Sequence, residues 1–344
     1  MHQAWRFAGG TDGPEAVSLG DAILHLRTPG DGTLWVDLDG PSADDLHQID
    51  NAVGLGEFLL EDLHEGAADA GQRTKLQPHG DLFHVAVRDC TVVERRLVER
   101  EIDLVFGPGW LVSVRHHPDG HLDEDPDPFP VLDVQRRFAA QCRTERIIDQ
   151  GFVLWAFLDV VTDRFLAITD AIDERLDDAE AYLLDDDGND GRGAPAVVGS
   201  PRDLFDTGRL LTSFRHHVVP LREVVGALLR REDPSIGDLA LLHLRDVYDH
   251  LLGLTEVVES QRDVLAGLRD VHLTLVSNQV NRSMQQLAAW GAILIVATLI
   301  TGVLGMNFRD APNVSWHVGF AVVVGVIAII TVPMLLFFRK RRWL

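Results

Sequence analysis

Two long runs without charged side chains close the chain and dominate its pattern of polar and apolar positions. No charged residue occurs between Arg282 and Arg309, and between Asp310 and Arg339 the only titratable side chain is His317. Each run exceeds the roughly 20 residues that cross a hydrocarbon core of about 30 Å. One such run fits a buried soluble helix, but two in succession favour a membrane hairpin. We therefore predict transmembrane helices over 283–308 and 317–338, an extracellular or periplasmic loop over 309–316, and a basic tail over 339–344.

The orientation of this hairpin follows from the distribution of positive charge. The loop between the runs carries Arg309 against Asp310, whereas the tail is strongly cationic, with Arg339, Lys340, Arg341 and Arg342. Because Lys and Arg accumulate on the cytoplasmic side of membrane helices, the tail is expected in the cytoplasm. A hairpin brings the long N-terminal part to the same side. We therefore expect a multi-pass protein of the cell (inner) membrane with both termini cytoplasmic.

The first 140 residues alternate short apolar runs with turn residues. The runs are rich in β-branched and aromatic side chains, which is typical of strands; they cover 33–38, 82–87, 102–106 and 110–114. The last two flank Gly107-Pro108-Gly109, which predicts a hairpin turn. Phe58, Leu59 and Leu63 recur at helical spacing between the first two runs. The sequence thus predicts a cytoplasmic α/β domain over 1–140.

Long helices are predicted from about Thr144 onward, where the apolar period changes from two to three and four. One pattern continues to about Leu184, and a second begins near Leu204 and contains Pro220, which should kink it. From about Asp238, nothing stops a helix until the end of the first apolar run, which implies about 70 continuous residues, near 100 Å. A helix of that length needs lateral partners to bury its apolar stripe. We expect a helical stalk region over 141–282 that assembles with other copies.

A stripe of small and polar residues follows the first membrane helix. Steps of three and four from Asn281 reach Met284, Ala288, Gly291, Ile295, Thr298 and Gly302. Small and polar residues of membrane helices face the interior of a bundle, so symmetric copies would surround an axis with this stripe. Met284 and Leu287 are candidates for an apolar constriction that gates by dewetting. The alternative is that the stripe is only a helix–helix interface.

The stripe offers neutral oxygens and no carboxylate, which bears on the ion. A dehydrating Ca²⁺ cage or a tight Zn²⁺ site needs anionic oxygens, His or Cys. Mg²⁺ gives up its coordinated water reluctantly. Amide and carbonyl oxygens that accept hydrogen bonds from its hydration shell therefore suit it. No nucleotide-binding motif occurs, and a potential of about 100 mV supplies roughly 4.6 kcal/mol to a divalent cation. Passive uptake of Mg²⁺ is therefore sufficient, with no enzymatic activity and no other cofactor expected.

The overall charge excludes one class of partner. The formal net charge is -22 although the chain ends in a basic cluster. Nucleic acid is therefore not an expected partner. Two cysteines, Cys90 and Cys142, lie far apart without metal-type spacing around either. The pairs His116-His117 and His216-His217 are interpreted as surface or stalk histidines, because adjacent residues on a helix diverge by about 100°.

Several segments together resemble the CorA magnesium/cobalt transporters. They are Trp35 to Leu38, Leu60 to Leu63, Arg245 to His250, Val276 to Asn278 with Asn281, Gly302 to Phe308, and Lys340 to Leu344. The tripeptide Gly305-Met306-Asn307 alone is a weak signal, but its place between two terminal spans, with a Lys/Arg-rich ending before Trp343-Leu344, makes the resemblance specific. The resemblance implies an α/β N-terminal cytoplasmic domain, a long helical stalk and two C-terminal transmembrane helices, arranged as a pentameric funnel.

The resemblance also implies roles for individual residues of a homopentamer in the lipid bilayer. Gly305, Met306 and Asn307 would form the selectivity filter. The pore would be lined by Asn281, Met284, Leu287, Gly291, Ile295, Thr298 and Gly302. Cations of the tail, Arg339, Lys340, Arg341 and Arg342, would ring its exit. Mg²⁺ would also act as a regulatory ion at Asp246, with Asp89 as the candidate partner from the N-terminal domain.

Two departures from the family pattern keep the transported ion open. Leu304 stands where an aromatic residue is common, and the loop after Asn307 lacks the usual glutamates and places Arg309 at the outer mouth. The leading prediction is a Mg²⁺ channel that also passes Co²⁺ or Ni²⁺ and is gated by cytoplasmic Mg²⁺. The alternatives are a Zn²⁺ transporter similar to ZntB, coupled to protons, and a membrane-anchored scaffold without transport.

Overall fold

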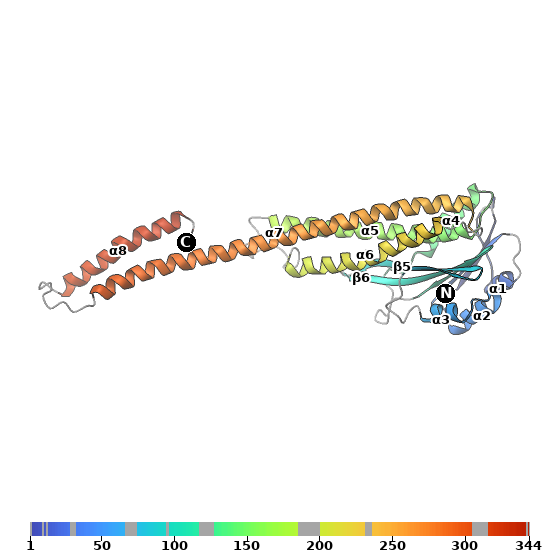
Figure 1. The fold of residues 1–344 in the computed structure, drawn as a ribbon, viewed down its shortest axis with the longest axis horizontal. Helices are drawn as coiled ribbons and strands as arrows, with labels where there is room; N and C mark the ends of the chain where they lie inside the picture. Colours follow the sequence, from blue (N-terminus) through green and yellow to red (C-terminus); the bar gives the residue numbers. More distant parts are fainter. Residues whose placement is uncertain are drawn as a thin grey trace. The chain divides into compact units, whose positions relative to one another are not determined.

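The computed structural model describes residues 2–8, 10–11, 13–27, 32–65, 74–93, 96–116, 127–184, 200–230, 236–304, 316–341 and 343 (Figure 1). Its strands are β1 (Gln3–Phe7), β2 (Glu15–Ala16), β3 (Thr33–Asp39), β4 (Lys75–His79), β5 (Leu82–Val93), β6 (Arg96–Gly107) and β7 (Trp110–Arg115). Its helices are α1 (Leu19–Arg27), α2 (Ala43–Val53), α3 (Glu57–Glu65), α4 (Val131–Thr144), α5 (Gln150–Leu184), α6 (Pro201–Arg230), α7 (Asp238–Leu304) and α8 (Trp316–Lys340).

The described strands form one mixed sheet in the order β2-β1-β3-β7-β6-β5-β4. Neighbouring strands are antiparallel except β3 and β7, which are parallel with Leu34 opposite Trp110. The predicted hairpin is confirmed: Gly107 pairs with Trp110, so Pro108 and Gly109 form a two-residue turn. Gly109 has φ of 81°, a conformation that favours glycine. Strands β1, β2 and β4 were not predicted from the sequence pattern.

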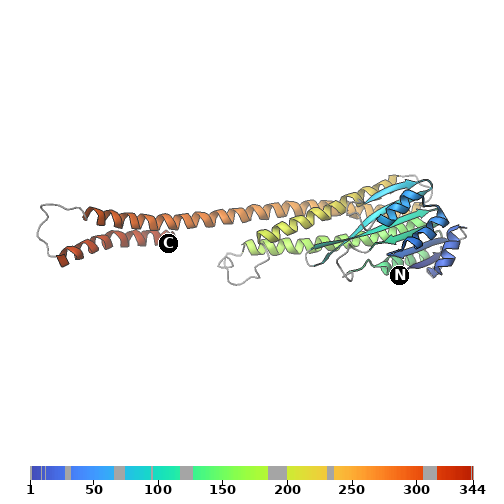
Figure 2. The ribbon, with the colours of Figure 1, turned by 90° about the horizontal axis from the view of Figure 1, so that it is seen from below.

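The sheet separates two hydrophobic cores, and helices cover each face (Figure 2). On one face Val36 of β3 packs in a cluster with Leu26 of α1, Ile49 of α2 and Leu59 of α3. On the other face α4, α5, α6 and the first part of α7 share a larger cluster with the strands. The alternation of apolar residues along β3 thus supplies both cores, because successive side chains point to opposite faces.

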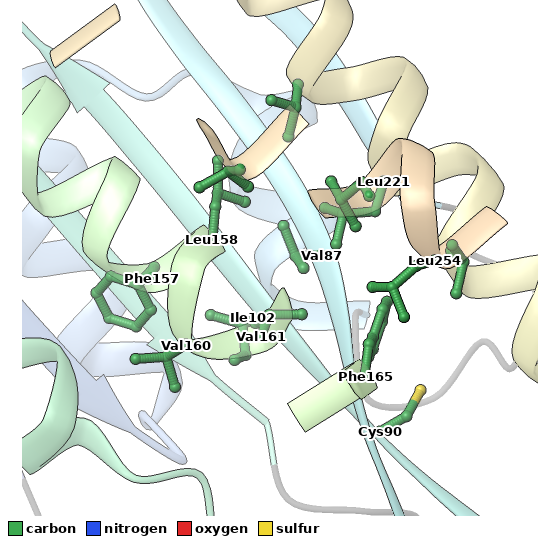
Figure 3. Close-up of a cluster of buried hydrophobic side chains, with 14 of the residues drawn as sticks. Val87, Cys90, Ile102, Phe157, Leu158, Val160, Val161, Phe165, Leu221 and Leu254 are labelled. Carbon is green, nitrogen blue, oxygen red and sulfur yellow. The ribbon is translucent and has the colours of Figure 1, made fainter. Parts of the chain in front are cut away.

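The larger core fixes the long helices to the sheet (Figure 3). Each contributing element supplies fully buried side chains: Val87 and Ile102 from the sheet, Phe157, Leu158, Val161 and Phe165 from α5, Leu221 from α6, and Leu254 from α7. Complete burial of an apolar side chain of this size contributes about 1.5–3 kcal/mol. The sheet and the helices up to Leu268 therefore belong to one compact unit, Met1–Leu268, and Arg269–Leu344 forms a second.

One detail of the helical region differs from the sequence prediction. The helix expected from about Thr144 starts later, because α5 begins only at Gln150, and a separate helix, α4, ends at Thr144. The side chain of Asp149 accepts hydrogen bonds from the backbone N–H groups of Gly151 (2.8 Å) and Gly237 (2.7 Å), which caps α5 and ties the segment before α7 to it. Pro220 lies inside α6, as the sequence predicted, and the kink expected there stays a prediction.

The long helix after Asp238 is confirmed. Helix α7 runs without interruption through 67 residues to Leu304. With the mixed α/β N-terminal part, the helical stalk and the C-terminal helices, the predicted fold class is confirmed. The chain divides into its two compact units between Leu268 and Arg269, within α7, and the predicted domain bounds at residues 140 and 282 stay predictions.

Candidate functional site

Among the described residues, one helix qualifies by length and composition as membrane-spanning. It is α7 over Asp238–Val303, with a mean hydropathy of 1.9 in its most apolar stretch. Only 6% of that stretch is buried, so it is not a core helix of a soluble fold. An exposed apolar surface of this size indicates contact with lipid or with another protein.

The part of α7 in the second unit has two different faces. Ala289 is fully buried and Ile293 is 9% exposed, whereas Leu287 is 77% exposed. Helix α8 runs back beside this part of α7 in both views (Figures 1 and 2). Its own partly buried positions recur at helical spacing, at Ile327, Thr331, Met334 and Phe338. The buried face of α7 is thus the one that meets α8.

The predicted pore-lining residues lie on the other face of α7. Gly291 is half-buried, and the remaining members of the set are exposed: Asn281, Met284, Leu287, Ile295, Thr298 and Gly302. The hydroxyl of Thr298 donates to the carbonyl of Leu294 at 2.7 Å within the helix. Its oxygen therefore presents lone pairs outward as an acceptor, which suits a donor such as the water of a hydrated cation.

The candidate filter residues Gly305, Met306 and Asn307 lie outside the described residues, as do the loop over 309–315 and Arg342. The described cations of the tail, Arg339, Lys340 and Arg341, are exposed at the end of α8. The structure therefore places the residues of the α7 stripe on one face of the helix, whereas the filter stays a prediction.

The two candidate regulatory carboxylates have opposite environments. The Asp246 side chain is 70% exposed on α7, with His250 Nδ1 3.9 Å from its Oδ2. Asp89 is fully buried in β5 and is paired with Arg164 Nε at 2.7 Å and Arg100 Nη1 at 3.3 Å. Burial raises the pKa of Asp89 to about 6, and the two guanidinium groups oppose that rise. Its oxygens are occupied by arginines, so Asp246 alone of the two is open to an ion.

A buried polar cluster in the sheet was missed by sequence reasoning. Asp103 Oδ1 lies 2.7 Å from His84 Nε2, and Asp103 Oδ2 lies 3.0 Å from His116 Nε2. Burial opposes ionisation of Asp103, but the hydrogen bonds to His116 and His84 hold its pKa below the usual value. Glu101, 4% exposed, is bonded at 3.3 Å to Arg88, and its Oε1 has no hydrogen-bond partner in the described structure. Burial and the nearby Asp103 raise the pKa of Glu101 to about 7.

This cluster shows that His116 is not a surface histidine, whereas His217 lies on α6, within the predicted stalk region. The side chain of His116 is 8% exposed, and that of His217 on α6 is 11% exposed with its Nε2 3.0 Å from Glu99 Oε1. The sequence signal was the period-two recurrence of Glu99, Glu101 and Asp103 along β6, which sets acids on one side of a strand. Within the described residues no three His, Cys, Asp or Glu side chains converge as a metal site.

Comparison with known proteins gives a match along nearly the whole chain. The model of a family described as CorA-like Mg²⁺ transporter protein matches residues 30–340. The cobalt/magnesium transport protein CorA of Thermotoga maritima is 27% identical over 332 residues, covering 94% of this chain and 87% of that protein. The zinc transport protein ZntB of Klebsiella pneumoniae is 23% identical and covers 94% of this chain and 100% of its own length.

A solved structure has the same fold. The complete structure of the CorA magnesium transporter from Methanocaldococcus jannaschii superposes with a TM-score of 0.76 at 18% identity. The superposition covers 100% of this chain and 99% of that one. The sheet, the long helices and the C-terminal helices thus recur together in one architecture.

Proposed function

This chain belongs to the family of CorA-like Mg²⁺ transporters, and from that premise we propose that it is a homopentameric channel for hydrated Mg²⁺. The family makes it a divalent metal transporter of the membrane and not an enzyme. The proposal adds the ion, the pentamer and the pathway. In it, α7 lines the pore from Asn281 to Gly302, and Gly305, Met306 and Asn307 form the outer filter.

The observation that carries this proposal is the division of α7 into two faces. Ala289 and Ile293 are buried toward α8, so the face with Thr298 and Asn281 is free to meet copies of itself. Rings of neutral oxygen accept hydrogen bonds from coordinated water without stripping it, which suits an ion that dehydrates reluctantly. An exposed carboxylate on this face would instead favour direct coordination, and the stripe carries none.

Gating is proposed at the cytoplasmic end of the stripe. Met284 and Leu287 are 64% and 77% exposed in the single chain, and symmetric copies would bring these apolar side chains into rings. A ring of this kind closes a pore to ions by excluding water. With α8 as the second span, both termini lie in the cytoplasm, and the tail cations Arg339, Lys340, Arg341 and Arg342 follow α8 on the cytoplasmic side.

Regulation by cytoplasmic Mg²⁺ is proposed at Asp246. Its carboxylate is exposed on α7. Burial raises the pKa of the nearby Asp159 against the opposing effect of Arg137, and the charge of Asp246 adds a smaller part of that rise. A divalent cation relieves the repulsion between neighbouring carboxylates. Asp89 has no place in this site, because a cation there would have to displace two arginines.

Uptake into proteoliposomes with an inside-negative potential tests the function. Mg²⁺ influx should follow the potential, be indifferent to a pH gradient, and fall in Asn307→Ala but not in the control Asn313→Ala, in the predicted loop over 309–316. Unchanged influx in Asn307→Ala contradicts the filter. The amount of pentamer is measured by light scattering for each variant, so loss of assembly is not mistaken for loss of conduction.

Zinc is the second candidate ion. The similarity to ZntB spans 94% of this chain, and Arg309 follows the tripeptide closely, where a positive charge opposes cation entry. In the same proteoliposomes, Zn²⁺ flux that tracks a pH gradient, with no Mg²⁺ flux, would assign the chain to zinc transport.

A further inference from the structure

The face of α8 turned away from α7 is a continuous apolar stripe that ends in a cation. Its large exposed side chains recur at helical spacing: Val322 (59%), Val326 (40%), Ile329 (73%) and Leu336 (59%). At about 100° per residue, Lys340 falls on the centre line of this stripe, opposite the partly buried row that includes Thr331 and Phe338. An apolar track therefore leads to one ammonium group.

Two arginines flank that ammonium group. Arg339 and Arg341 project about 100° to either side of Lys340, and all three side chains are exposed. The guanidinium of Arg341 lies over the Phe337 ring at 5.6 Å from its centroid, a cation–π contact that limits its orientations. Three cations thus surround the end of the stripe rather than pointing toward α7.

The chain after α8 adds an aromatic anchor at the same level. The backbone N–H of Trp343 donates to the carbonyl of Phe338 at 3.0 Å, which turns the chain back onto the last helical turn. The Trp343 and Phe338 rings stack with centroids 5.7 Å apart and planes at 14°. Trp is enriched where hydrocarbon meets headgroups, so this turn marks the depth of the interface.

This combination fits one class of ligand. An acyl chain packs along an exposed apolar track, and a phosphate binds guanidinium or ammonium donors. A glycerophospholipid has both an acyl chain and a phosphate, separated along the depth of one leaflet. The protein as a whole is acidic, with a formal net charge of -22, but the end of α8 gathers cations. This local positive charge complements an anionic lipid surface. Lys340 lies on the side of α8 opposite the partly buried row, so its ammonium group is turned away from α7.

We propose that Lys340, flanked by Arg339 and Arg341, binds the phosphate of an anionic phospholipid of the cytoplasmic leaflet whose acyl chain lies along the α8 stripe. The inference rests on the part of the proposed function that makes α8 a membrane span with a cytoplasmic end. It does not depend on the ion that the pore conducts.

Spin-labelled lipids provide the test on the full-length protein in phosphatidylcholine vesicles. We expect labelled phosphatidylglycerol to associate several-fold more strongly than labelled phosphatidylcholine. Lys340→Gln and Arg341→Gln should each lower that preference by about fivefold at most, since one basic residue near an anionic surface contributes about that factor. The charge-conserving Lys340→Arg should retain it.

Three results would overturn the proposal. They are equal association of both lipids with the wild type, an unchanged preference in the double variant Lys340→Gln/Arg341→Gln, and loss of the preference in 20 mM inorganic phosphate but not in chloride of equal ionic strength. The last result would assign the site to a free anion. Metal uptake by the same vesicles is measured separately, so a preference without uptake counts against the channel and not against the lipid site.

Discussion

The two compact units treat charge and apolar surface in opposite ways. In Met1–Leu268, carboxylates such as Asp89 and Asp103 are fully buried and held by arginine or histidine partners. In Arg269–Leu344, apolar side chains such as Leu287 and Ile329 are more than 70% exposed. The first unit pairs these buried carboxylates with side chains of the same unit. The second unit instead exposes apolar side chains that lipid and other copies would cover. Stability should therefore reside mainly in the first unit and conduction in the second.

The largest effect should come from removing a buried charge of the first unit. Asp89→Ala leaves Arg100 and Arg164 without the carboxylate that both contact, and breaking a buried pair costs about 3–5 kcal/mol. Thermal unfolding of the purified protein followed by circular dichroism should show a Tm far below that of the wild type. Glu256→Ala, an exposed acid on α7, is the control and should lie within about 0.5 kcal/mol of the wild type. Similar Tm values for both variants would contradict the claim that buried, paired carboxylates such as Asp89 stabilise the first unit.

A matched pair of alanines tests the two faces of α7. Ala289 is fully buried and Ala288 is exposed on the proposed pore face. Ala289→Leu should destabilise the protein by about 1–3 kcal/mol through overpacking against α8. Ala288→Leu should leave the Tm unchanged and reduce Mg²⁺ flux by narrowing the pathway. If Ala288→Leu lowered the Tm and Ala289→Leu reduced the Mg²⁺ flux instead, the face of α7 with Ala289 would line the pore.

The pH dependence of stability should report Glu101. Its pKa in the folded protein is about 7, above the ordinary value of 4.5. Between these values the folded protein holds a proton that the unfolded chain releases, so this contribution to stability is lost as pH rises through 7. Glu101→Gln should therefore be more stable than the wild type by about 1–2 kcal/mol at pH 8, and the difference should shrink toward pH 5. Parallel stability curves would show that Glu101 ionises normally.

The smallest effect on stability is expected at Asp246. Its exposed carboxylate makes only a 3.9 Å contact with His250, so Asp246→Asn should change the free energy of unfolding by less than about 0.5 kcal/mol. In the proposed regulation the same variant should conduct at internal Mg²⁺ concentrations that close the wild-type pore. Normal closure in the variant, measured by uptake into Mg²⁺-loaded vesicles, would exclude Asp246 as a regulatory ligand.

The sequence predicted those features that repeat along the chain. The α7 helix and the Pro108-Gly109 hairpin were readable because helical spacing, uncharged length and turn chemistry are local signals. The break between α4 and α5 was not, because Asp149 reaches Gly237 across 88 positions. The pairing of Asp103 with His84 and His116 likewise depends on strand register, which a single strand does not reveal.

For the candidate site, the sequence identified the stripe but not which face of α7 is free. That assignment needed Ala289 and Ile293, two ordinary apolar residues whose burial depends on α8. Asp89 shows the reverse case, since an acid on a sheet strand looks exposed until Arg100 and Arg164 are placed against it.

Cysteine accessibility at Thr298 tests most directly whether the exposed face of α7 lines the ion pathway. The native Cys90 and Cys142 are buried, so they give little background with a water-soluble methanethiosulfonate reagent. We predict that the reagent blocks potential-driven Mg²⁺ uptake by Thr298→Cys and leaves Ile293→Cys, on the buried face, conducting. Block of Ile293→Cys with continued uptake by Thr298→Cys would contradict the account.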